Sequence, residues 1–192
     1  MEPKGVEMYE IEVKAWDTET EKTEQIVSSF AEYKGFFDKT DVYYEQKTQP
    51  KQNIRLRFEK AFLENNLIAE KNLVTFKQKE LFENGIEVSK ETEFEVSDKN
   101  AFFNMLENIG FEFSIKKHKK VKSYSYKEFC IELVEIENLG NFIEIETIQP
   151  DESAETIEKS QCAIFEILDK CNIPKENIEK RYYLELLKAA QR

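Results

Sequence analysis

The sequence predicts an α+β fold of about eight strands with helices around them. Eight segments alternate apolar and polar side chains, which is typical of strands, and four segments have the apolar spacing of helices. Glycine and proline are scarce, with 5 and 4 among 192 residues, which favours long regular elements. A chain of this length fits one domain, so we expect a single domain over residues 1–192.

The first predicted strand is YEIEVKAW at residues 9–16. Successive side chains of a strand point to opposite faces, so this segment has one apolar face and one charged face. The charged face consists of Glu10, Glu12 and Lys14. The same alternation predicts seven further strands, at residues 36–47, 53–60, 72–80, 86–96, 111–126, 128–136 and 141–148.

Helical spacing of apolar residues predicts four helices, at residues 18–35, 97–110, 151–172 and 174–190. Gly35 is expected to end the first of them as a C-cap. In the second helix, Phe102, Met105, Leu106 and Ile109 form the apolar stripe that is expected to face the core. The two C-terminal helices, which together cover residues 151–190, are expected to pack on the barrel.

The composition argues against several classes of protein. A net charge of −11 discourages binding to nucleic acid, because such proteins present a basic surface to the phosphates. No apolar run has the length of a membrane span, and the N-terminal segment lacks the apolar core of a signal peptide. We therefore expect a cytoplasmic protein without membrane or nucleic-acid partners. Three unpatterned cysteines and one histidine, His118, offer no zinc-binding set.

Like charges repeat at every second position within single strands, and the sign changes from strand to strand. The basic rows are Arg55 with Arg57, Lys77 with Lys79, and Lys117 with Lys119, and the acidic rows are Glu91 with Glu93 and Glu95, and Glu144 with Glu146. A sheet with one solvated face is the simplest interpretation. The helices must cover the apolar faces, however, so closure of the sheet turns the charged rows toward one another.

Charged rows that face each other inside a narrow barrel imply a ligand. Confined like charges repel, and their desolvation is costly unless an occupant compensates them. A triphosphate offers many negative charges to the basic rows, and Mg²⁺ or Mn²⁺ prefers the oxygen ligands of the acidic rows. A local basic face also allows an acidic protein to bind an anion. The charge pattern therefore predicts a triphosphate with a divalent metal ion as the ligand.

Six segments, taken in order, resemble one known family. They are ExExK at 10–14, RLR at 55–57, FKQK at 76–79, KETEFEV at 90–96, the basic strand around 117–119, and ENLGNFIEIE at 137–146. Over almost its whole length the chain is therefore similar to the CYTH superfamily, the triphosphate tunnel metalloenzymes. The segments LGNFIEIE, RYYLELL and VYYEQ resemble its class IV adenylyl cyclase branch in particular.

The resemblance implies an eight-stranded antiparallel β-barrel that closes into a tunnel with helices around it. It also implies Mg²⁺- or Mn²⁺-dependent chemistry on a nucleoside triphosphate or another triphosphate. The implied metal ligands are Glu10, Glu12, Glu144 and Glu146. The implied triphosphate ligands are Lys14, Arg55, Arg57, Lys77, Lys79, Lys117 and Lys119, with Arg181 at the tunnel mouth and with Lys14, Arg57 and Lys79 as the catalytic residues. The implied bracing residues behind them are Glu91, Glu93, Glu95 and Glu132, with a second metal site as the alternative role of the first three. Relatives are often dimers, so a homodimer is a further expectation.

The chain departs from the cyclase pattern at two positions of the tunnel wall. Val134 stands where the pattern has an acid, with Glu132 on the same face as a substitute, and Lys119 stands where arginine is common. The favoured interpretation is a class IV adenylyl cyclase that converts ATP to cyclic AMP and pyrophosphate. The alternatives are an inorganic or thiamine triphosphatase, and a non-catalytic binder of polyphosphate or nucleotide. Tyr182 and Tyr183 are interpreted as core aromatics, with base stacking as the alternative.

Overall fold

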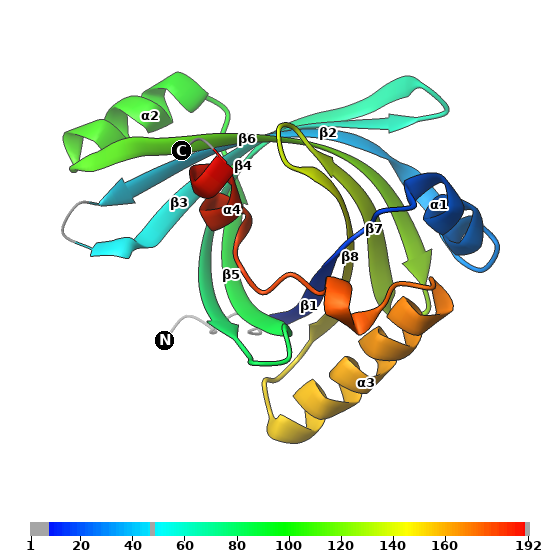
Figure 1. Cartoon of the computed structure of the whole chain (residues 1–192). Coiled ribbons are helices and arrows are strands. Elements are labelled where there is room, and N and C mark those ends of the chain that lie inside the picture. Colours follow the sequence, from blue (N-terminus) through cyan, green and yellow to red (C-terminus); the bar gives the residue numbers. More distant parts are fainter. Residues whose placement is uncertain (1–7, 47–48, 191–192) are drawn as a thin grey trace.

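The structure, a computed structural model, describes residues 8–46 and 49–190. Within these residues, eight antiparallel strands close into a barrel in the order β1-β5-β4-β3-β2-β6-β7-β8, which confirms the predicted fold class (Figure 1). Both ends of the predicted domain, and residue 47 of one predicted strand, lie outside the described residues.

The strands are β1 (Tyr9–Trp16), β2 (Glu32–Gln46), β3 (Gln49–Leu63), β4 (Asn66–Leu81), β5 (Glu87–Glu95), β6 (Phe111–Tyr126), β7 (Phe129–Ile136) and β8 (Gly140–Gln149). The helices are α1 (Thr20–Ser28), α2 (Lys99–Asn108), α3 (Ala154–Lys170) and α4 (Tyr183–Ala190), with one short 3₁₀ turn at Lys175–Asn177.

Strand β1 closes the barrel because it pairs with two neighbours at once. β5 lies on one side of it and β8 on the other, both antiparallel. Glu12 is directly opposite Glu87 of β5 and directly opposite Glu146 of β8. Side chains that are opposite one another in neighbouring strands point to the same face of the sheet. The closure therefore places these three carboxylates in one row that faces the lumen.

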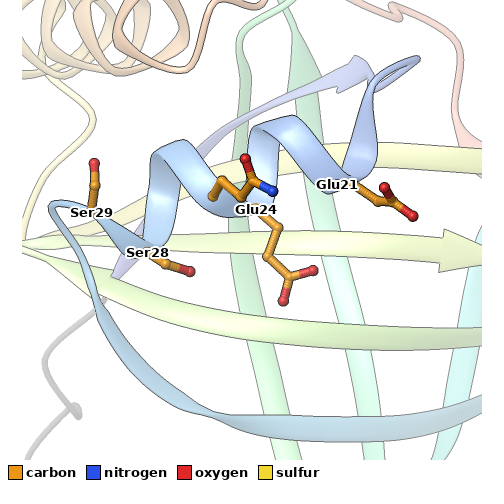
Figure 2. Close-up of a pocket in the computed structure, with 5 residues that line it drawn as sticks. Glu21, Glu24, Ser28 and Ser29 are labelled. Atoms are coloured by element: carbon orange, nitrogen blue, oxygen red, sulfur yellow. The ribbon is translucent and has the colours of Figure 1, made fainter.

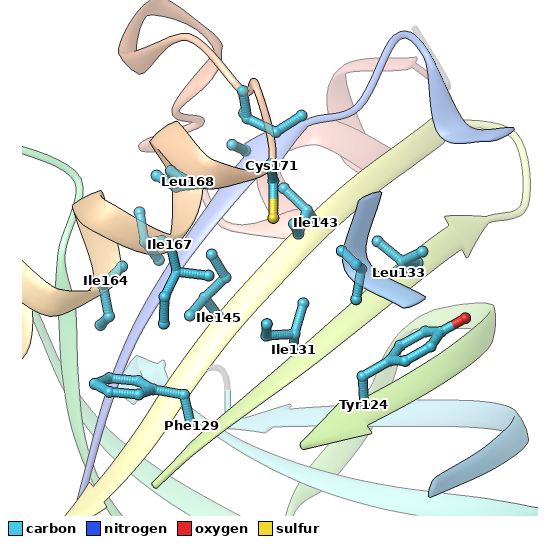
Figure 3. Close-up of a cluster of buried hydrophobic side chains, with 14 of the residues drawn as sticks. Tyr124, Phe129, Ile131, Leu133, Ile143, Ile145, Ile164, Ile167, Leu168 and Cys171 are labelled. Carbon is cyan, nitrogen blue, oxygen red and sulfur yellow. The ribbon is translucent and has the colours of Figure 1, made fainter. Parts of the chain in front are cut away.

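The main apolar core lies on the outside of the barrel wall, under α3. Figure 3 shows Ile164, Ile167 and Leu168 of α3 close to Ile143 and Ile145 of β8. Full burial of each such side chain contributes roughly 1.5–3 kcal/mol. The two isoleucines of β8 alternate with its acidic row, so packing under α3 turns that acidic row into the barrel.

A second apolar cluster lies at one mouth of the barrel, beneath α4 (Figure 1). Leu186 and Leu187 of α4 pack there with Val121, Val134 and Phe142. These three strand residues point to the lumen side by strand alternation, so the helix closes part of the interior. None of the described helices is long and apolar enough to cross a membrane.

The first predicted helix is shorter than expected, and its predicted cap is wrong. α1 ends at Ser28, and Gly35 is a residue of β2. Its φ is +142°, and a Cβ at this position would lie 2.8 Å from the carbonyl oxygen of Phe62. The close approach of β3 therefore requires glycine here, and the chain has already turned into β2 at Glu32.

The last predicted helix is wrong over its first half, where the 3₁₀ turn at Lys175–Asn177 is followed by extended chain; we call residues 174–182 the C-terminal strap. The backbone N–H of Glu179 donates to the carbonyl of Lys14 at 3.0 Å. Ile178 forms an antiparallel bridge with Ala15. Because these bonds tie the strap to β1, its backbone groups are not free for helical pairing, and helix α4 begins only after the strap.

Helix α2 has a capped N-terminus, but its predicted apolar stripe is only partly buried. Asp98 accepts a hydrogen bond from the N–H of Asn100 at 3.0 Å. Leu106 is buried, whereas Met105 and Ile109 are 47% and 56% exposed, so their predicted core positions are wrong. The helix lies over one end of the sheet, against β6, where only one side of the stripe finds strands to cover (Figure 1).

We expect Ile164→Ala to lower the free energy of unfolding by about 2–5 kcal/mol, because it leaves a cavity under α3. Urea unfolding followed by circular dichroism measures the change. Glu158→Ala, on the exposed side of the same helix, is the control and is expected to change it by less than about 0.5 kcal/mol. Equal effects of the two substitutions would show that α3 is not anchored through this face.

Candidate active site in the barrel lumen

The barrel encloses a cavity of about 740 Å³ with a mainly charged wall. Each of the eight strands contributes lining side chains, and so does the start of α4. The predicted site residues that line it are Glu10, Glu12, Lys14, Arg55, Arg57, Lys77, Lys79, Glu91, Glu93, Lys117, Lys119, Glu132, Glu144 and Glu146. The structure thus brings most of the predicted set into one enclosed space.

Two predicted residues, Glu95 and Arg181, are not on the cavity wall. Glu95 is exposed at the last position of β5. Arg181 lies in the C-terminal strap, where its side chain is 60% exposed and its Nη2 donates to Glu179 at 2.7 Å. The structure therefore gives Arg181 a partner within the strap and no place at the tunnel wall, because the extended strap turns it outward.

Three carboxylates, those of Glu10, Glu12 and Glu146, form a cluster in which one oxygen of each lies within 4.8 Å of the others. Among the described residues, no side-chain hydrogen bond or ion pair satisfies Glu12 or Glu146. Burial and the neighbouring Glu10 and Glu132 carboxylates raise the pKa of Glu146 well above its ordinary value. Converging oxygens of this kind suit Mg²⁺ or Mn²⁺, which prefer hard oxygen ligands. The cluster could therefore hold a divalent metal ion.

The fourth predicted metal ligand, Glu144, lies apart from this cluster. It accepts a hydrogen bond from Lys119 Nζ at 3.0 Å. Burial alone would raise the pKa of Glu144, but Lys119, Tyr183 and Lys117 together outweigh it and lower that pKa. The structure therefore places Glu144 as the partner of a basic-row lysine.

Most of the lumen cations are paired with carboxylates in this structure. Lys77 contacts both Glu10, at 2.8 Å, and Glu91. Lys79 pairs with Glu87 at 2.5 Å. The basic and acidic rows lie on separate strands. Ion pairs between these strands therefore hold the side chains of both rows in place.

Sequence reasoning missed several charged residues of this network, among them Lys39, Asp41 and Glu87. Lys39 Nζ donates to Glu132 at 3.0 Å, and Glu87 is almost fully buried beside Lys79. None of the three was recognised as part of a row of like charges. Strand parity was the available signal. Lys39 and Asp41 are on the same face of β2 as Tyr43, and Glu87 is on the same face of β5 as the acidic row.

Lys14 differs from the other lumen cations. Its side chain is only 6% exposed, yet no carboxylate of the described residues lies within salt-bridge distance. Its Nζ lies 5.6 Å from the ring centroids of both Tyr182 and Tyr183. A buried ammonium group without an ion-pair partner is costly, so an anionic ligand beside Lys14 would be stabilised.

Aromatic side chains form one part of the cavity wall. Tyr43, Tyr182 and Tyr183 line it together with Leu184. Burial and the neighbouring Glu144 carboxylate raise the pKa of Tyr183 well above its ordinary value, so this phenol remains protonated. Tyr44 points the other way and stacks on Phe103 at 5.4 Å. Tyr182, at the end of the strap, and Tyr183, at the start of α4, therefore both line the cavity, and Tyr183 also packs against the apolar cluster beneath α4.

The structure accounts for Val134, which stands where the cyclase pattern has an acid. Val134 is 2% exposed and belongs to the apolar cluster beneath α4. Glu132, its neighbour on the same face, lines the cavity and contacts Lys39 and Lys119. The charged part of the lumen therefore ends at Glu132, and an acid at position 134 would lie in an apolar layer.

Two features outside the barrel do not belong to this site. Figure 2 shows a shallow surface hollow on α1, near Glu21, Glu24, Ser28 and Ser29, which includes none of the predicted site residues. His118 lies on the outer face of β6, with its Nε2 3.0 Å from Asp38. The lumen is therefore the candidate site.

The comparison with protein families agrees with the geometry. The sequence model of the CYTH domain matches residues 8–183, which is nearly the whole chain. The chain belongs to the CYTH domain family. A search for similar curated proteins finds no match.

Solved structures of similar proteins share the fold. The PH1819 protein of Pyrococcus horikoshii is 25% identical with a TM-score of 0.80, over 95% of this chain and 99% of its own. A Vibrio parahaemolyticus protein described as a candidate adenylate cyclase is 17% identical with a TM-score of 0.78, over 94% and 98%. A Hippeastrum protein described as a candidate adenylyl cyclase with a dominant triphosphatase activity is 15% identical with a TM-score of 0.64, over 95% of each chain.

We expect Glu146→Gln to raise the melting temperature of the protein in chelator at pH 8. The raised pKa of Glu146 means that the folded state disfavours the ionised form, so wild-type stability falls as the pH rises above the ordinary glutamate value. Glutamine removes this charge, and each kcal/mol gained corresponds to about 2–4 °C. Scanning calorimetry measures the shift.

The matched control for this stability measurement is Glu135→Gln, which removes an exposed charge from the outer face of β7. Its melting temperature is expected to equal that of the wild type at every pH. A melting temperature of Glu146→Gln below that of the wild type at pH 8 would contradict the repulsion among the three clustered carboxylates.

Proposed function

We propose that this chain is a metal-dependent enzyme that transfers a phosphoryl or nucleotidyl group of a triphosphate bound in the barrel lumen. The observation that supports it is the meeting of the carboxylate cluster of Glu10, Glu12 and Glu146 with the basic rows in one cavity of about 740 Å³. A triphosphate is long enough to touch several of the rows. A divalent ion on the cluster would share its oxygens with such a ligand.

The proposed roles follow from what each group can offer. When bound, the divalent ion would neutralise phosphate oxygens and make the phosphorus more electrophilic. Lys14 would contribute an ammonium group that has no competing carboxylate. Arg55 and Arg57 would offer planar forks for pairs of phosphate oxygens, and Lys77 and Lys79 would offer point charges. Catalysis would then consist mainly of positioning and of stabilising the charge that develops on the leaving group.

Among reactions of this kind we propose cyclisation of ATP to cyclic AMP and pyrophosphate. The aromatic part of the cavity wall, at Tyr43, Tyr182 and Tyr183, offers an apolar surface that a nucleoside would use and an inorganic triphosphate would not. In this reaction the ribose 3′-hydroxyl attacks the α-phosphorus, and the bond from that phosphorus to the pyrophosphate oxygen breaks. The LGNFIEIE segment and the likeness in fold to the Vibrio protein support the same choice.

Hydrolysis of a triphosphate is the second proposal. The same charged rows would hold inorganic or thiamine triphosphate, with water as the nucleophile at the terminal phosphorus. The Hippeastrum protein, which shares the fold, is described as having a dominant triphosphatase activity, and this supports the second proposal. Both reactions would use the same cations, so the products distinguish them.

Incubation of the purified protein with Mn²⁺ and ATP is expected to yield cyclic AMP and pyrophosphate in equal amounts, as measured by liquid chromatography with mass spectrometry. Inorganic and thiamine triphosphate are tested in parallel. Release of orthophosphate without cyclic AMP would replace the cyclase with a triphosphatase. Binding of the triphosphate without any product would show a non-catalytic binder.

Glu12→Gln is expected to reduce turnover of the preferred substrate roughly 100-fold or more, because it removes one oxygen ligand from the metal cluster. Initial rates at several Mn²⁺ concentrations measure the loss. Glu135→Gln, on the outside of the barrel, is the control and is expected to keep the wild-type rate. Undiminished turnover by Glu12→Gln would remove the cluster from the mechanism.

A further inference from the structure

We infer that Asp41 is a positioning residue of the triphosphate site, holding Arg57 and Lys117 from beneath the side chains that line the cavity. This inference rests on the proposed function, because it concerns the same basic rows. Asp41 lies in the middle of β2 and was not found by reasoning from the sequence. Its partners both line the cavity, whereas Asp41 itself does not.

The sheet register sets this arrangement. Asp41 is directly opposite Arg57 of β3 and directly opposite Lys117 of β6. β2 lies between these two strands, so the three side chains leave the sheet side by side toward the same face. A carboxylate in the central position can therefore reach a cation on either side.

The contacts of Asp41 use both of its oxygens. Arg57 donates from Nε to Oδ1 at 2.7 Å and from Nη2 to Oδ2 at 3.1 Å, which is a two-point contact of fixed orientation. Lys117 Nζ lies 3.1 Å from Oδ2. The hydroxyl of Tyr43, another lining residue, lies 3.5 Å from the same oxygen. Three side chains of the wall thus converge on one carboxylate.

Asp41 is buried beneath the side chains that line the cavity. Its side chain is 0% exposed, so no ligand in the cavity can touch it. Burial alone would raise the pKa of Asp41, but Arg57 and Lys117 outweigh it and hold that pKa well below the ordinary value. The carboxylate is therefore ionised at neutral pH. The remaining N–H groups of Arg57 and Lys117 are left for the lumen.

Asp41 differs in this respect from most of the other carboxylates that pair with lumen cations. Glu10, Glu87, Glu132 and Glu144 all line the cavity themselves, so a triphosphate could displace them from their lysines. A ligand cannot displace a carboxylate that it cannot reach. The Asp41 contacts would therefore persist in the bound state and fix where two phosphate-binding groups point.

Positioning and simple charge neutralisation predict opposite results for Asp41→Asn. If Asp41 only cancels positive charge, its loss makes the lumen more positive and strengthens binding of an anion. If it orients Arg57 and Lys117, its loss weakens binding even though the lumen gains positive charge. The sign of the change in affinity therefore separates the two roles.

The experiment is isothermal titration of the full-length protein with tripolyphosphate in the presence of Mg²⁺. We expect Asp41→Asn to bind at least 10-fold more weakly than the wild type, and Asp41→Glu, which keeps the charge, to recover part of the loss. Asp38→Asn, on the outer face of the same strand, is the control and is expected to bind like the wild type. Binding by Asp41→Asn that equals or exceeds that of the wild type would overturn the inference.

A second measurement separates failure of the inference from failure of the proposed function. The Arg57 Nε–H signal in ¹⁵N NMR, assigned with Arg57→Lys, is expected to be protected from exchange in the ligand-free wild type and lost in Asp41→Asn. If the wild type binds no tripolyphosphate, the proposed function fails, and a signal that persists in Asp41→Asn overturns the positioning role as well. If Asp41→Asn does not fold, Asp41→Glu is titrated instead, and wild-type affinity in it overturns the inference.

Discussion

The pairing of β1 with β5 on one side and β8 on the other is the constraint on which the rest of this structure depends. It closes the sheet, and closure decides which face of every strand is inside. Because α3 covers the apolar face of β1 and β8 from outside, the charged face has only the lumen to occupy. The candidate site is thus a direct consequence of strand pairing and outer packing, and it needs no dedicated loop.

The lumen reverses the usual distribution of a folded protein, with the apolar layer outside the wall and the charges within it. Such an interior is tolerable because most cations have a carboxylate partner, as between Lys79 and Glu87. Within the described part of the chain, Lys14 and two carboxylates of the cluster, Glu12 and Glu146, have no ion-pair partner. An anion beside Lys14 and a cation at the carboxylate cluster would therefore each be stabilised. The least stable parts of the interior thus coincide with the proposed chemistry.

The sequence was sufficient where charge repeats at every second residue, because strand parity then fixes a whole row at once. This holds for Arg55 with Arg57 and for the row that contains Glu146. It was insufficient for Asp41, whose importance comes from neighbours on two other strands and not from its own segment. The strap at 174–182 was missed for the same reason, since its helical periodicity is overridden by hydrogen bonds to β1. Local patterns reveal faces, whereas partners distant in the chain are set only by the closed topology.

The attachment of the strap to β1 has a consequence for how the molecule is made. β1 is synthesised before the strands β2 to β7, and its partner β8 and the strap follow them in the chain. The edge of β1 that pairs with β8 therefore stays unpaired until the intervening strands have been made. Topologies with such distant contacts fold slowly and expose their edges to wrong partners. Closure of this barrel is consequently a late step of folding, in which β8 and the strap meet β1 beside Lys14.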